Sequence, residues 1–171
     1  MIAERTKTVK LTFFREALIY DAHNIAYVEG DIVKTNTVDD KGHFIQDIAE
    51  DGNIDRVTRV LDLAIAECVE ACYPYSKVPV EQTTEMDDTF RETDAYVVNL
   101  LVPDDFSQTT VTLIERYIHE LLVCRVLADW FSITYPDKAA LWDAKAEAAK
   151  QAMQSSLNAR IGRVRKTQTP F

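Results

Sequence analysis

The first residues whose types and spacing could do chemistry are the neighbours His119 and Glu120. A histidine followed by a glutamate begins the helical signature of zinc metalloproteases, in which a second histidine four residues after the first completes the ligand pair. That position is Val123 in this chain. We therefore interpret His119 and Glu120 as polar residues of a helix. The alternative interpretation is that both residues, together with an acidic segment, serve an intracellular metal-dependent hydrolase.

Two cysteines also have a spacing that a metal site could use. Cys68 and Cys72 are four residues apart, so they lie on the same face of a helix. Tetrahedral zinc needs two more ligands, and only Cys124 or a distant histidine could supply them. Because all three cysteines fall within apolar helical patterns, we predict reduced core residues of an intracellular protein and no metal site.

Carboxylates are concentrated between Pro79 and Phe106, where Asp87, Asp88, Glu92 and Asp94 could serve general acid–base catalysis or bind a divalent cation. Their order does not match a calcium-binding loop, and nothing indicates a buried pair. We predict a solvated acidic loop, with a docking surface for a basic partner as the alternative. The sequence contains no phosphate-binding glycine loop, nucleophile elbow or dinucleotide fingerprint. We therefore expect no catalytic residues, no cofactor and no enzymatic activity.

Three helices are predicted from apolar periodicity, and prolines and glycines separate the periodic segments. Residues 53–73 form an amphipathic helix that Pro74 ends. Residues 108–133 form a long helix that is apolar on almost every side and is the expected centre of the domain. Residues 137–160 form an alanine-rich helix, whose buried side contains Trp142, Ala146, Ala149, Met153 and Leu157. The short link around Pro136 predicts that the last two helices form an antiparallel hairpin.

The N-terminal third is less regular. Alternating apolar residues predict a strand over residues 8–13, followed by a helix up to Gly30; a hairpin through residues 21–24 is the alternative. The apolar run 96–102 predicts a buried strand. The fold class is thus mainly α: a helical bundle with a long central helix, a helical hairpin and a minor β element. We expect one helical domain over residues 1–159, including an N-terminal extension over residues 1–50, and a separate arm over residues 160–171.

Charge divides this arm from the rest of the chain. The net charge is −9, yet residues 160–171 contain four of the 19 lysines and arginines and none of the 28 acidic residues. Because residues 1–159 are acidic, we do not expect this part of the chain to bind DNA or RNA non-specifically, since phosphate groups require a basic surface. The N-terminus has no apolar signal core and no apolar run approaches about 18 residues, so export and membrane insertion are not expected.

The arm is too short and too polar to form a core of its own. We predict that it binds a neighbouring copy or another protein, through Arg160, Arg163, Arg165, Lys166 and the terminal Phe171. Aromatic residues also gather near the hairpin turn, at Trp130, Tyr135 and Trp142. We interpret that group as core packing, with an intersubunit patch as the alternative.

The order of these segments, over about residues 50–171, resembles that of head-to-tail connector proteins of tailed bacteriophages and prophages. The likeness includes the stretch 101–106 (LVPDDF) before the long helix, the hairpin with an alanine-rich helix and the basic arm. Segments 53–61 (NIDRVTRVL) and 122–130 (LVCRVLADW) resemble structural proteins encoded by phages of gut Bacteroidetes.

This resemblance implies a non-enzymatic ring of about a dozen copies beneath the portal protein, with heterologous contacts between subunits. It further implies other neck or tail proteins as partners, DNA that passes through without sequence-specific binding, no membrane association, and a location in the virion after assembly in the cytoplasm of the bacterial host. The arm would reach into the portal. A third possible function, besides the hydrolase, is an acidic binding module that mimics DNA.

Overall fold

A computed structural model describes residues 6–36, 42–81 and 83–158 of the chain. The elements, in order, are β1 (Thr6–Phe14), α1 (Arg15–Asn36), α2 (Gly42–Gln46), the 3-10 helix η1 (Asp47–Ala49), α3 (Asp51–Ala71), β2 (Ala95–Pro103), α4 (Gln108–Thr134) and α5 (Pro136–Asn158). The part described is therefore mainly helical, with five α-helices and a small two-stranded antiparallel sheet. This confirms the predicted fold class. None of these helices is both long enough and apolar enough to cross a bilayer.

Helix α4 lies at the centre of the domain, as its apolar periodicity predicts. It packs against α5, α3 and α1, and its side chains at Ile118, Leu121 and Leu127 are fully buried. Because α4 is covered on several sides, an apolar residue is favoured at nearly every position that faces a neighbouring element.

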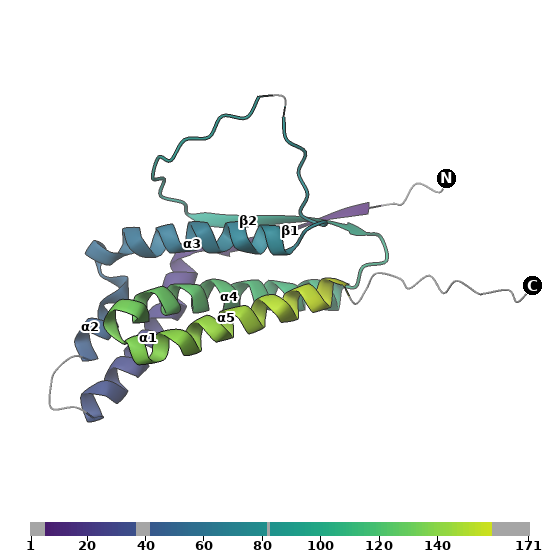
Figure 1. The fold of residues 1–171 in the computed structure, drawn as a ribbon. Coiled ribbons are helices and arrows are strands. Elements are labelled where there is room, and N and C mark those ends of the chain that lie inside the picture. Colours follow the sequence, from purple (N-terminus) through teal and green to yellow (C-terminus); the bar gives the residue numbers. More distant parts are fainter. Residues whose placement is uncertain (1–5, 37–41, 82, 159–171) are drawn as a thin grey trace, which may run out of the picture.

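The predicted hairpin of α4 and α5 is confirmed. Only Tyr135 separates the two helices, and Pro136 occupies the first turn of α5, where a missing N–H costs no helical hydrogen bond. The helices run side by side along their lengths (Figure 1). The buried residues of α5 are those of its predicted apolar side: Trp142, Ala146, Ala149, Met153 and Leu157.

The two predicted strands pair with each other although residues 15–94 lie between them in the sequence. The antiparallel register runs from Thr6 opposite Pro103 to Phe14 opposite Ala95. The prediction that the second strand is buried is wrong for one of its faces. Along β2, buried and exposed side chains alternate, so that Val98 and Leu100 face the core while Leu101 lies on the exposed face.

Helix α1 is continuous from Arg15 to Asn36, so the alternative hairpin through residues 21–24 is excluded. The prediction that Gly30 ends this helix is also wrong. A Cβ at Gly30 would come within 2.6 Å of the Gly42 carbonyl oxygen. Gly30 is therefore the point where α2 approaches α1 closely, a role that its position in the sequence does not distinguish from a helix end.

The described part of the N-terminal segment belongs to the same core as the rest. Leu11 and Phe13 of β1 and Leu18 and Ala26 of α1 are buried in the single apolar cluster that also contains α4. The segment predicted as an extension is thus packed into the domain, and it forms one wall of a groove described below.

Candidate interaction surfaces

The four predicted acidic residues lie in or next to a long connection between α3 and β2. Residues 77–94 form no regular structure in the described positions, and they arch away from the helices above α3 (Figure 1). Asp87 and Asp88 are exposed in this loop, whereas Glu92 and Asp94 lie at its end, where it returns to the domain. The structure therefore divides the predicted acidic surface into two parts.

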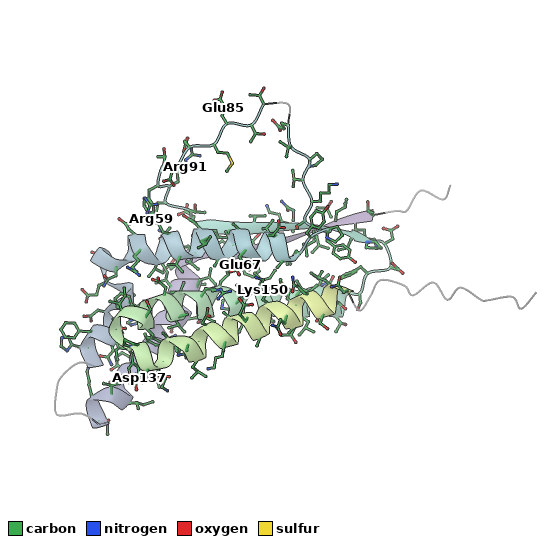
Figure 2. The ribbon with its side chains drawn as sticks, in the orientation of Figure 1. Arg59, Glu67, Glu85, Arg91, Asp137 and Lys150 are labelled. Carbon is green, nitrogen blue, oxygen red and sulfur yellow. The ribbon has the colours of Figure 1, made fainter. Side chains whose placement is uncertain are left out.

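The returning limb of the loop is fastened to the domain by two contacts and stiffened by an ion pair of its own. Arg15 donates a hydrogen bond to Glu92 at 2.8 Å, and Arg59 of α3 lies over the Phe90 ring at 5.0 Å from its centroid. Arg91 pairs with Asp87 within the loop at 2.9 Å. Figure 2 shows Arg91 on this limb, above Arg59, and Glu85 further out along the loop. The outer part of the loop therefore stands on an anchored base.

Apolar side chains in the loop are exposed to an unusual degree. Val78, Val80 and Met86 have exposed fractions of 79%, 85% and 92%. Loops longer than about 12–15 residues without secondary structure are uncommon in compact domains and are often functional. An anchored loop with exposed apolar residues is a suitable surface for contact with another protein.

A groove of about 790 Å³ lies where β1 passes into α1. We call it the α1 groove. Its apolar part is formed by Phe14, Ile19, Tyr20 and Ile54. Phe14 and Tyr20 are exposed by 62% and 64%, so this floor is open to a ligand or a partner.

The rim of the α1 groove is acidic. It contains Glu16 and Asp21 from α1, Glu92 and Asp94 from the end of the loop, and a single basic residue, Arg15. Arg15 pairs with Glu92, as described above, and Asp21 pairs with His119 at 2.7 Å. Within the described residues, Glu16 and Asp94 form no direct ion pair, although the charge of Asp94 acts on the nearby Arg15.

A second groove of about 760 Å³ separates α3 from the α4–α5 hairpin. Its walls are apolar and include Leu63, Ala128 and Ala139, but its charged rim is already paired. Arg125 contacts Glu67 at 2.9 Å and also pairs with Asp143 and Glu147.

The same network extends to α5 through Lys150, which contacts Glu67 at 2.8 Å; Figure 2 shows Glu67 and Lys150 facing each other between α3 and α5. Burial raises the pKa of Glu67, but the ion pairs with Lys150 and Arg125 outweigh it and hold the pKa below the ordinary value of 4.5. This arrangement joins three helices and is a structural contact.

The structure does not assemble the residues of the alternative hydrolase into one site. His119 pairs with Asp21 of α1, a residue that the sequence analysis did not select. Glu120 instead accepts a contact at 3.5 Å from the Cys124 thiol on its own helix. The histidine–carboxylate contact links residues that are 98 positions apart, so periodicity along one helix could not reveal it.

All three cysteines are free and buried, as predicted for core residues. Burial raises the pKa of each thiol to about 12. The Cys72 sulfur lies 3.8 Å from the Met153 sulfur, which is a core contact between α3 and α5. Across residues 6–36, 42–81 and 83–158, no three His, Cys, Asp or Glu side chains are grouped so that they could hold a metal ion.

The aromatic residues near the hairpin turn belong to the core, as interpreted from the sequence. Trp130 and Trp142 are both buried, and the Trp142 ring packs edge-on against Phe131. The indole of Trp130 donates a hydrogen bond to the Ile45 carbonyl at 2.8 Å. This bond ties α2 to α4, so the intersubunit alternative is wrong for the two tryptophans.

The predicted partner-binding residues of the arm, from Arg160 to Phe171, lie outside the described residues. No protein-family model, curated protein or solved structure matches the chain.

Proposed function

We propose that this protein is a structural component of a tailed bacteriophage or prophage particle. It forms a ring in the neck, between portal and tail, and lines the passage for DNA. The support is the resemblance stated from the sequence, and the elements that carry it follow one another as expected: α3, β2 before the long α4, and the hairpin with alanine-rich α5. The basic arm follows directly after this hairpin in the sequence.

The observation that carries the proposal is the loop of residues 77–94. Its exposed side chains at Val78, Val80 and Met86 lose contact with water only if another protein covers them. The loop is anchored at Phe90 and Glu92, so part of its ordering is already present before a neighbouring subunit is met, which lowers the entropy cost of the contact. In a ring, such a loop on one side of a subunit would meet a different surface of the next subunit.

The charge of the chain is compatible with this function. An acidic body repels DNA, which allows the nucleic acid to slide through a channel without being held. The four positive charges of the arm suit attachment to an acidic neighbour. The portal protein and a second copy of this chain are the two neighbours that the resemblance suggests.

Deleting Gly162 to Phe171 tests this proposal in particles. We expect helical content to stay nearly unchanged, because the described core does not include these residues, and we expect DNA-filled heads without tails. The control is a chain that keeps the arm but carries Glu70→Lys and Asp105→Lys, two exposed residues outside the arm. Tailed, infectious particles formed by the truncated chain as efficiently as by the full chain would contradict the proposal.

The alternative functions predict other results in simple assays. One zinc per chain, lost on Cys68→Ser or His119→Ala, would indicate a metal enzyme. A stable monomer that displaces DNA from its binding protein would indicate a DNA mimic. Either result would replace the connector proposal.

A further inference from the structure

The α1 groove combines two properties that the basic arm would need in a receptor. Its floor presents the exposed rings of Phe14 and Tyr20. Its rim holds four carboxylates and one guanidinium. That guanidinium, Arg15, pairs directly with Glu92, so the carboxylates of Glu16 and Asp94 form no direct ion pair within the described ranges. The groove is therefore open, apolar and net negative.

The arm has the complementary chemistry. It carries Arg160, Arg163, Arg165 and Lys166, no acidic residue, and one aromatic residue, Phe171. Arginines pair well with carboxylates because the guanidinium can donate two parallel hydrogen bonds. Phe171 is the one aromatic residue of the arm and suits a floor of exposed aromatic rings.

The second groove, between α3 and the α4–α5 hairpin, is less suitable. Its rim carboxylates at Glu67 and Asp143 are paired with Arg125, and Asp129 is paired with Arg56. An incoming arginine would have to displace an existing guanidinium there. Charge complementarity thus selects the α1 groove.

The position of the arm indicates which copy of the groove it occupies. The end of α5 lies beside the end of α3, because Gln154 contacts the Ala71 carbonyl at 3.5 Å. The α1 groove contains Ile54, at the opposite end of α3, about 26 Å away at 1.5 Å per helical residue. Figure 1 shows the end of α5 at the opposite end of the molecule from α1 and α2.

The arm therefore starts at one end of the subunit while its own receptor lies toward the other. The thirteen residues after Asn158 span at most about 45 Å when extended, so they could reach their own groove only by turning back along the domain. In a ring, the neighbouring subunit would present its own α1 groove to the arm, so the arm would not have to turn back along its own domain.

We propose that the arm of residues 160–171 binds the α1 groove of a neighbouring copy. Phe171 lies on the floor made by Phe14 and Tyr20, and the arm's arginines pair with Glu16 and Asp94. This inference rests on the proposed ring and specifies the contact that closes it. It assigns the predicted residues Glu92 and Asp94 to a receptor for the arm and leaves Asp87 and Asp88 in the outer loop.

Charge reversal in the full chain tests the contact. Glu16 and Asp94 are exposed, so Glu16→Lys with Asp94→Lys should leave the fold intact by circular dichroism. We expect self-association to weaken at least about tenfold in analytical ultracentrifugation, since like charges then face each other across the interface. Adding Arg163→Glu and Arg165→Glu to the same chain should restore it. Glu70→Lys with Asp105→Lys, which changes the net charge equally, should have no such effect.

Cross-linking distinguishes a neighbouring copy from the same copy. One chain carries Phe171→Cys and a second, with a mass tag, carries Tyr20→Cys; the native thiols are buried. Mild oxidation of the mixture should give a disulfide between the two chains.

Two results would overturn the inference. One is a chain with both cysteine substitutions that cross-links only within itself, and the other is a charge-reversed chain that forms rings as readily as the wild type. In that last case the connector function would stand and only the arm contact would fail. If no variant forms rings, the proposed function fails, and a disulfide between mixed chains would still support the contact.

Discussion

Alanine at two glycines, Gly30 and Gly52, should change stability in opposite directions. Both glycines lie within helices, where replacing glycine by alanine ordinarily stabilises by about 0.5–1 kcal/mol because alanine loses less backbone entropy. A Cβ at Gly52 meets nothing within 4 Å. Gly52→Ala should therefore show this gain, reduced to a few tenths of a kcal/mol if the first turn of α3 frays.

At Gly30, the surroundings should make the same substitution destabilising. A Cβ there would lie 2.6 Å from the Gly42 carbonyl oxygen and 2.6 Å from Cγ of Gln46. The first of these atoms is backbone, so α2 has to move. Gln46 joins α2 to α1 by accepting a hydrogen bond from Lys34 at 2.6 Å and donating to Asp31 at 2.9 Å, and these bonds would be disturbed.

Overpacking costs about 1–3 kcal/mol, which exceeds the helical gain, so Gly30→Ala should be about 1–2 kcal/mol less stable than the wild type. Urea denaturation followed by circular dichroism measures the free energy of unfolding. Tryptophan fluorescence is a second probe, because Trp130 is bonded to α2 at Ile45. Protein concentration has to be the same throughout, since the proposed self-association would contribute to the apparent stability. If Gly30→Ala stabilised the protein as much as Gly52→Ala, the close approach of α1 and α2 would be refuted.

Three further predictions concern the core, the ion-pair network and the thiols. Leu121→Ala should destabilise the protein by about 2–5 kcal/mol, because Leu121 is fully buried in α4, whereas Leu63→Ala, at a side chain exposed by 73%, should cost much less; a loss below about 0.5 kcal/mol for Leu121→Ala would contradict the central position of α4. The lowered pKa of Glu67 means that its ionised form stabilises the fold above pH 4.5, and that this contribution is lost as the pH falls through the folded-state pKa. The stability difference between wild type and Glu67→Gln, measured by denaturation at several pH values, should therefore shrink on acidification, and a constant difference would exclude this role. Burial raises the pKa of the thiols of Cys68, Cys72 and Cys124 to about 12. Iodoacetamide at pH 8 should therefore label these cysteines far more slowly in the folded chain than in urea. Rapid labelling of the folded chain, detected by mass spectrometry, would show that the thiols are accessible.

Helices α3, α4 and α5 were predictable from the sequence because their apolar periodicity reports burial directly, whereas α2 was not predicted. The face of α5 that contains Trp142 and Met153 is an example, since residues three and four apart share one side of a helix. The single-sided burial of β2 was missed because Val97 and Leu101 are apolar although they lie on the exposed face. Hydrophobic composition alone does not distinguish a strand that is covered on one side from one covered on both.

Contacts between distant segments could not be predicted in this way. The pairing of β1 with β2, and of Asp21 with His119, depends on how the helices pack and leaves no periodic pattern in the sequence. The α1 groove could not be predicted for the same reason, because its acidic rim combines residues from α1 with Glu92 and Asp94 from the end of the loop. The sequence indicated an acidic surface there but gave no sign of the aromatic floor beside it.

The central claim is that this chain assembles into a closed ring. Native mass spectrometry of the purified full-length protein, over a range of concentrations and together with negative-stain electron microscopy, tests it most directly. We predict one discrete oligomer of about a dozen copies that appears as a ring with a central channel, as closed heterologous contacts require. A chain that stays monomeric at every concentration, both alone and when mixed with the proposed partner, a portal protein, would contradict the account.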